Sequence, residues 1–153
     1  MIQLHNFTTL DLSQKELILS WRNHPSVRKW MINDNEISLE EHLHFIKLLA
    51  TKANSRYILV QNESHYIGVI NLTEIHNNSA ELGIYANPDM RGVGSILMRA
   101  LIHYALTLGI SNLIANVFIT NVRAQKLYQK FEFTEIRRIA SNKKKMMTLE
   151  KKL

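Results

Sequence analysis

The stretch LGIYANPDMRGVGSIL, residues 82–97, decides the fold. It begins as a β-strand that ends near Tyr85, continues through a turn that holds Gly92 and Gly94, and enters the strongest amphipathic helix pattern of the chain, residues 96–108. A strand, a glycine-rich turn and a helix start together present free backbone N–H groups and the positive end of a helix dipole. We therefore predict an anion-binding turn formed by the backbone of Met90, Arg91, Gly92, Val93, Gly94 and Ser95.

Two common phosphate motifs are absent from this turn. The dinucleotide fingerprint needs a third glycine where this chain has Leu97, and no Gly-Lys-Ser/Thr follows as a nucleotide-triphosphate loop requires. The anion is therefore not identified by the glycines alone.

Along the rest of the chain, stretches with the two-residue period of β-strands alternate with stretches that have the 3.6-residue period of helices. Strands are expected near residues 2–7, 56–61, 66–75, 80–85, 113–119, 133–138 and 145–151, and helices near 13–22, after Ser38, over 96–108 up to Gly109, and after Asn121. Such interleaving predicts an α/β (α+β) domain with a mixed sheet and about four helices on both of its faces. Residues 1–153 are expected to form a single domain, since no repeat or linker marks a boundary.

A second motif follows the next strand. Asn121, Ala124 and Tyr128 stand at positions 1, 4 and 8 of NVRAQKLY. Together with the glycine turn, this segment resembles the acyl-CoA site of the GNAT acetyltransferase superfamily, whose signatures are Gln/Arg-x-x-Gly-x-Gly/Ala after a strand and Asn-x-x-Ala-x-x-x-Tyr on the following helix. The chain departs from the first signature at Asp89, which cannot donate a hydrogen bond to a pyrophosphate oxygen, so backbone amides must do most of that work.

The resemblance implies a mostly antiparallel sheet of about seven strands with a splayed fourth strand, and acetyl-CoA as cosubstrate. The free edge of that strand, around Leu82, Gly83 and Ile84, would pair with the pantetheine arm and polarise the thioester carbonyl. Asn121 would cap its helix and contact the pantetheine, Ala124 would leave room beside it, and the Tyr128 hydroxyl would protonate the leaving thiolate.

The N-terminal half carries a narrower resemblance. The segments WRNHP (residues 21–25), residues 38–46 and residues 67–73 are similar to those of GNAT enzymes of pseudaminic acid biosynthesis for flagellin glycosylation. Those enzymes acetylate the 4-amino group of UDP-4-amino-4,6-dideoxy-N-acetyl-β-L-altrosamine. By this resemblance Arg22, His42 and Thr73 would line the pocket for the nucleotide, and Tyr85 would lie near the reacting centre.

The absence of cysteine excludes a thiol acyl-enzyme, and direct attack within a ternary complex follows. Glu81 and His42 are the candidate proton acceptors for the sugar amine. Three alternatives stay open: a protein N-terminus as acceptor, a polyamine as acceptor, and a non-catalytic acyl-CoA-binding module. Arg22 and the histidines argue against a polyamine, which calls for an acidic pocket.

Composition limits other functions. The formal charge is +6, but residues 137–153 alone carry this excess and the charges of residues 1–136 are balanced, so a nucleic-acid surface is not expected. The basic segment, with Lys143, suits a turn between the last two strands.

No apolar run reaches the roughly 20 residues of a membrane span, and the N-terminus lacks a signal-peptide pattern, which favours a cytoplasmic protein without membrane contact. No metal site is expected, because His42 and His44 point to different sides of a helix. The resemblance allows a homodimer.

Overall fold

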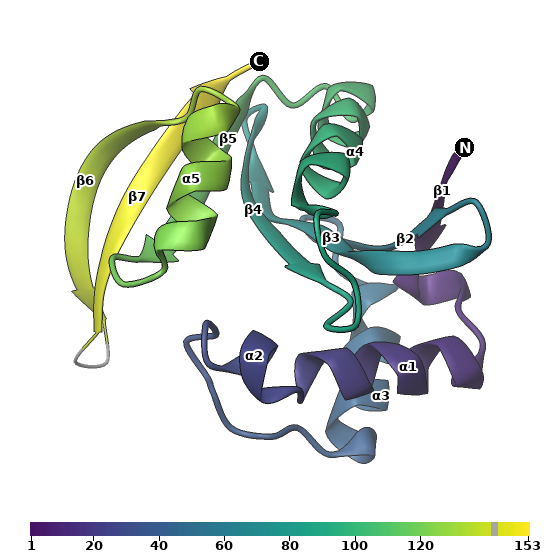
Figure 1. Ribbon diagram of the computed structural model, residues 1–153. Helices are drawn as coiled ribbons and strands as arrows, with labels where there is room; N and C mark the ends of the chain where they lie inside the picture. The colour runs from purple at the N-terminus through teal and green to yellow at the C-terminus, as the bar shows by residue number, and fades with distance from the viewer. Residues whose placement is uncertain (142–143) are drawn as a thin grey trace.

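Seven strands form one sheet in the computed structural model, which describes residues 1–141 and 144–153 (Figure 1). In spatial order they are β1 (Ile2–Asn6), β2 (Arg56–Asn62), β3 (His65–His76), β4 (Ser79–Ala86), β5 (Asn112–Phe118), β7 (Lys144–Lys152) and β6 (Thr134–Ser141). Neighbouring strands are antiparallel except β4 and β5, which are parallel. The predicted seven-stranded, mostly antiparallel sheet is confirmed. The basic C-terminal residues belong to β6 and β7, and Lys143 lies outside the described residues.

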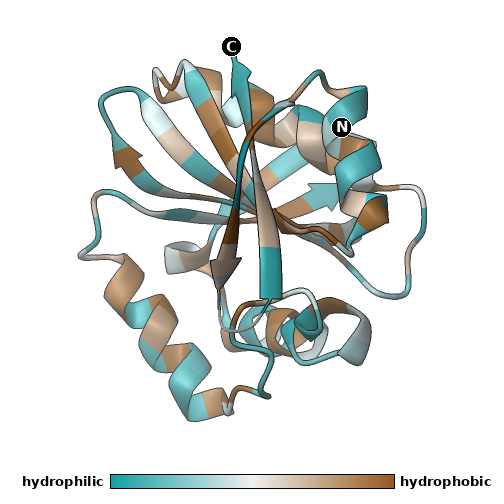
Figure 2. Cartoon of the chain, turned by 90° about the vertical axis from the view of Figure 1, so that its left-hand side faces the viewer, coloured by the Kyte–Doolittle hydropathy of each residue, from teal (hydrophilic) through white to brown (hydrophobic). Residues whose placement is uncertain are grey.

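Helices cover both faces of this sheet, as predicted. In the described chain they are α1 (Leu12–Arg22), α2 (Pro25–Arg28), α3 (Leu39–Leu49), α4 (Gly94–Thr107) and α5 (Val122–Lys130), with a short 3₁₀ turn, η1 (Phe7–Thr9), after β1. Alternation along the strands separates two cores: Leu59 and Val69 pack with α1 and α3, whereas their neighbours Ile58 and Ile70 pack with α4. In Figure 2 the helices mix hydrophobic and hydrophilic residues along their length, as helices with one buried face do.

The local signals at the helix ends explain most boundaries. Ser38 and Glu41 form a capping box at α3, with the Ser38 hydroxyl accepting from Glu41 N at 3.1 Å. Gly109, with φ of 75°, follows the last turn of α4, and the Asn121 side chain accepts from Ala124 N at 3.2 Å at the start of α5.

Two details differ from the sequence-based expectation. Phe7, expected as the end of the first strand, begins η1 and is buried, because the chain turns into the core there. A short helix that was not expected, α2, follows the helix expected over residues 13–22, and Pro25 stands at its first position. Its N-cap is His24, whose Nδ1 accepts from Ser26 N at 3.1 Å. Proline suits a first helical position, because that N–H has no partner in any case.

The sheet opens between its two central strands. β4 and β5 are paired only over Ser79–Glu81 and Asn112–Ile114. Beyond Glu81, β4 continues beside β3 while β5 continues beside β7, and Figure 1 shows the two strands diverging below α4 and α5. The splayed fourth strand is thus confirmed. Among the described residues, no helix is long and apolar enough to cross a lipid bilayer.

Candidate active site

A cavity of about 840 Å³ occupies the opening between β4 and β5. It brings together nearly all of the residues that the sequence predicts for the two substrates. The predicted residues that line it are Arg22, Thr73, Glu81, Leu82, Gly83, Ile84, Tyr85, Met90, Gly92, Val93, Gly94, Ser95, Asn121, Ala124 and Tyr128. Its size lies within the range of small-molecule sites, which is roughly 300–1,000 Å³.

The start of α4 forms one wall of the cavity. Among the described residues, no hydrogen-bond partner is found for the backbone N–H groups of residues 92–96, and the N-cap residue Val93 offers no side-chain bond. Gly92 has φ of 75°, a conformation that other residues rarely adopt. Free amides at the positive end of a helix dipole bind anions, so this wall fits a pyrophosphate.

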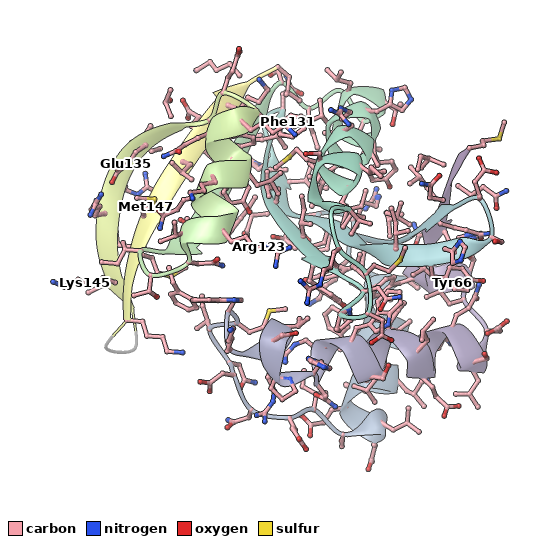
Figure 3. The ribbon with its side chains drawn as sticks, viewed as in Figure 1. Tyr66, Arg123, Phe131, Glu135, Lys145 and Met147 are labelled. Atoms are coloured by element: carbon pink, nitrogen blue, oxygen red, sulfur yellow. The ribbon has the colours of Figure 1, made fainter. Side chains whose placement is uncertain are left out.

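Positive charge lies beside this turn, but it does not come from the first position of the family's signature, where relatives carry Gln or Arg. Asp89 is exposed, and its backbone N donates to Asn87 Oδ1 at 3.0 Å. Arg91 is also exposed and does not line the cavity, so the structure gives no support to a direct role for its side chain there. Lys130 instead reaches from the end of α5 and donates from Nζ to Ser95 Oγ at 2.8 Å, which places a cation beside the amides of α4. Arg123, labelled in Figure 3 at the lower end of α5, lines the cavity.

The free edge of β4 forms the next wall. From Leu82 onward, β4 has no pairing with β5 in the described chain, so backbone groups on that side are open to the cavity. Gly83 pairs with Asn71 of β3, and a Cβ atom added at Gly83 would lie 2.5 Å from Asn71 Oδ1. The absence of a side chain at Gly83 therefore makes room for the Asn71 amide, which also lines the cavity.

Tyr128 of α5 also lines the cavity. Its ring packs edge-on against Phe133 with centroids 5.3 Å apart, and the residue is 8% exposed. Burial, and to a smaller extent the charge of Glu81, raises the pKa of Tyr128 to about 12. The phenol is therefore protonated at neutral pH and able to donate a hydrogen bond or a proton.

The opposite end of the cavity carries a cation with unused hydrogen-bonding capacity. Arg22, the last residue of α1, donates from Nη2 to the Asn33 carbonyl at 2.7 Å, while its Nη1 is buried and has no partner among the described residues. Burial, opposed by the charge of Tyr85, lowers the pKa of Arg22, but a guanidinium stays charged in a folded protein. Thr73 and Tyr85 line the same cavity, and burial raises the pKa of Tyr85. An unpaired guanidinium nitrogen of this kind suits an anionic ligand.

The loop after α2, residues 29–38, closes this end of the cavity against the other half of the sheet. The Trp30 ring lies 6.5 Å from the Phe118 ring, measured between centroids, and Lys144 Nζ lies 3.3 Å from Asp34 Oδ2. Lys144 Nζ also lies 5.0 Å from the centroid of the Phe118 ring. The loop is thus in contact with both β5 and β7.

His42 does not belong to this site. It is 5% exposed, and its Nε2 donates to the Lys15 carbonyl at 2.9 Å, which links α3 to α1. Burial lowers the pKa of His42, so the ring is neutral and serves as a donor within the core. The expectation of His42 as a base or as a contact for the nucleotide is corrected accordingly, because the helix turns this side chain toward α1. Among the described residues, no group of three or more side chains could hold a metal ion.

Sequence reasoning missed several cavity residues, among them Asn71, Asn116, Tyr57 and the residues of the loop after α2. Tyr57 and Asn71 come from strands expected in the sequence, so alternation alone could have placed them on one face. No sequence signal pointed to Asn116, because its position at the opening depends on how β5 leaves β4.

Comparisons with known proteins agree with this geometry. Residues 3–134 match the acetyltransferase (GNAT) domain family. The chain is 44% identical over 135 residues to acetyltransferase PseH of Campylobacter jejuni subsp. jejuni serotype O:23/36 (strain 81-176), covering 88% of this chain and 85% of that protein.

Solved structures show the same relationship. The crystal structure of C. jejuni N-acetyltransferase PseH in complex with acetyl coenzyme A superimposes with a TM-score of 0.82 at 37% identity, over 99% of each chain. A spermidine N-acetyltransferase from Vibrio cholerae in complex with CoA and spermine gives a TM-score of 0.88 at 18% identity, over 99% of this chain and 95% of that one, which shows a shared fold. The chain therefore belongs to the GNAT family of acetyltransferases.

Proposed function

We propose that this acetyltransferase moves acetyl from acetyl-CoA to the 4-amino group of a UDP-linked 4-amino-4,6-dideoxy sugar, the altrosamine derivative of pseudaminic acid biosynthesis. The observation that carries the proposal is the two-ended cavity. One end offers amides at the start of α4 and an edge of β4 that have no partner in the described part of the chain, and the other offers the Arg22 Nη1, which likewise has none there. The similarity to PseH over most of the chain supports the choice of acceptor.

Acetyl-CoA, as the cosubstrate, supplies an activated thioester. The amides of residues 92–96 fit its pyrophosphate, with Lys130 beside them, and the edge of β4 at Leu82–Ile84 fits its pantetheine arm. The Asn121 Oδ1 caps α5, which leaves the amide NH₂ of Asn121 free to donate to the pantetheine. Ala124 lines the cavity, and its small side chain leaves space for the cofactor. These residues hold the cofactor in the position that the reaction needs.

The UDP end is assigned to Arg22, Thr73 and Tyr85. The Arg22 guanidinium suits the diphosphate, because planar N–H donors match phosphate oxygens. The Thr73 hydroxyl suits a polar edge of the nucleotide, and Tyr85 would lie near the amine.

The chemistry is assigned to two side chains that line the cavity, Glu81 and Tyr128. Glu81 accepts the proton that the sugar amine gives up as its nitrogen binds the acetyl carbon. Tyr128 donates to the sulfur that leaves with the electron pair of the C–S bond. Holding the amine beside the acetyl group supplies most of the acceleration, since orientation converts a bimolecular step into a unimolecular one.

A polyamine acceptor is disfavoured by the charges of the cavity. Among the described lining residues, Glu81 is the one acidic side chain, and it is opposed by Arg22 and Arg123. A polycationic acceptor requires the reverse balance.

The test is mass spectrometry of the product formed from acetyl-CoA and the UDP-amino sugar, with fragmentation to place the acetyl group. Spermidine and a peptide with a free N-terminus serve as competing acceptors in parallel reactions. We expect one added acetyl group on the 4-amino nitrogen and no product from the competitors. Acetylation of spermidine or peptide alone would refute the choice of acceptor, and absence of free thiol with every acceptor would identify a binding module.

On the family resemblance we expect a cytoplasmic homodimer, and light scattering of the purified protein checks its stoichiometry.

A further inference from the structure

The carboxylate of Glu81 is held by a chain of hydrogen bonds that crosses the opening of the sheet. Glu81 is the last residue of β4 in register with β5, opposite Ile114. Asn116 stands two residues farther along β5, where the strands have separated, and its Nδ2 donates to Glu81 Oε1 at 2.9 Å. This bond spans the gap that the backbone no longer bridges.

The amide of Asn116 is itself oriented from the far side. Thr148 of β7 is in register with Asn116, and its hydroxyl donates to Asn116 Oδ1 at 2.6 Å. Thr148 is 0% exposed, so no water competes for this hydroxyl. Because a hydroxyl donor occupies the amide oxygen, the amide must present its NH₂ group to Glu81.

The arrangement leaves one carboxylate oxygen available. In the described chain, Glu81 Oε1 accepts from Asn116, whereas Oε2 has no hydrogen-bond partner and Glu81 forms no ion pair. Glu81 and Tyr128 both line the cavity, and the charge of Glu81 contributes to the raised pKa of Tyr128. Glu81 and Tyr128 therefore face the same cavity.

We propose that Asn116 and Thr148 are positioning residues that fix the Glu81 carboxylate as the proton acceptor for the amine. The inference rests on the proposed function, in which Glu81 takes that proton. The amine nitrogen forms its bond to the acetyl carbon and transfers a proton to Oε2, while the sulfur leaves as a thiolate with the electron pair of the broken C–S bond and accepts a hydrogen bond from the Tyr128 hydroxyl. Neither positioning residue needs to touch the substrate.

A second asparagine on the same strand provides a matched control. Asn112 also reaches across β5, donating from Nδ2 to Ser79 Oγ at 3.4 Å and to Glu150 Oε2 at 3.3 Å. It lies at the closed end of the β4–β5 pairing and does not line the cavity. Asn112→Ala therefore removes a comparable cross-strand side chain without disturbing Glu81.

The experiment measures free-thiol release with Asn116→Ala, Thr148→Val, Thr148→Ser and Asn112→Ala, using whichever acceptor supports turnover by the wild-type protein. We expect kcat to fall about 10- to 100-fold in Asn116→Ala and about 3- to 10-fold in Thr148→Val, since displacement of a reacting group by about 1 Å costs up to 10²-fold. The KM for acetyl-CoA should stay within about twofold in both. Thr148→Ser keeps the hydroxyl and should retain wild-type kcat, as should Asn112→Ala.

Thermal unfolding and calorimetric binding of CoA check that each variant folds. Unchanged kcat in Asn116→Ala, or equal losses in Thr148→Ser and Thr148→Val, would overturn the inference. Equal losses in Asn112→Ala and Asn116→Ala would also overturn it, because they would indicate a general weakening of the sheet. If the wild-type protein acetylates another amine but not the UDP-sugar, the proposed acceptor fails while these comparisons still decide the roles of Asn116 and Thr148. Absence of turnover with every amine would overturn both.

Discussion

Replacement of Tyr128 by Phe isolates the contribution of one hydroxyl to the reaction. The substitution keeps the ring, including its edge-on contact with Phe133 at 5.3 Å between centroids, so the core of the variant should be intact. Within the described residues, no hydrogen bond to the Tyr128 hydroxyl is found, so its loss leaves no protein group without a partner. A change in activity then reports on the chemistry.

The magnitude follows from the pKa of the buried phenol. Against a thiol pKa of about 8.5, a Tyr128 pKa of about 12 makes complete proton transfer to the thiolate unfavourable by about 5 kcal/mol. The hydroxyl therefore acts mainly as a hydrogen-bond donor to the developing negative charge on sulfur. Such a bond to a charged group contributes about 1.5–3 kcal/mol, which corresponds to about 10- to 100-fold in kcat.

The assay is thiol release under saturating acetyl-CoA and UDP-sugar, with CoA binding measured separately by calorimetry. We expect kcat of Tyr128→Phe to fall by about 10- to 100-fold and CoA affinity to stay within about twofold. A kcat equal to that of the wild type would remove Tyr128 from the chemistry. A loss of CoA affinity as large as the loss of kcat would show that the hydroxyl binds the cofactor instead.

Three further outcomes follow from the structure. Arg22→Ala should raise KM for the UDP-sugar at least about tenfold and leave KM for acetyl-CoA nearly unchanged, because its buried Nη1 lies at the acceptor end; equal effects in initial-rate kinetics would argue against that assignment. Gly68→Ala should lower the free energy of unfolding by about 1–3 kcal/mol in urea titrations, because the new Cβ would lie 2.6 Å from the Tyr85 carbonyl oxygen and 2.8 Å from Leu97 Cδ1; an unchanged midpoint would contradict this. His42→Phe should keep kcat and reduce the loss of stability below about pH 6.5, since the lowered pKa of His42 means that the unfolded chain takes up the proton first; urea titrations between pH 5 and 8 measure it, and a large fall in kcat would return His42 to the site.

The parts of the fold that the sequence predicts are those with local causes. The glycine turn with the start of α4, and the Asn121–Tyr128 helix, are determined by residues within a few positions of one another, and both were placed correctly. The order of strands and helices along the chain also predicted helices on both faces of the sheet, because each of these elements was identified from a local pattern.

The parts that escaped prediction depend on contacts between distant residues. Asn116 lies in the cavity only because β5 separates from β4 after three paired residues, which no local pattern encodes. His42 was assigned to the wrong surroundings, because a helix pattern identifies a buried face without saying what covers it. The short helix α2 was missed, since four residues carry no periodicity of their own.

The short pairing of β4 with β5 also affects how the folded protein responds to its surroundings. Beyond Glu81, where the described part of β4 is no longer paired with β5, backbone amides that face the opening should show fast hydrogen exchange. A ligand bound in this opening increases the free energy of unfolding by mass action. At a free ligand concentration 100 times the dissociation constant, that gain is about 2.7 kcal/mol. The lifetime of this enzyme against cellular proteases would then rise and fall with the supply of acetyl-CoA.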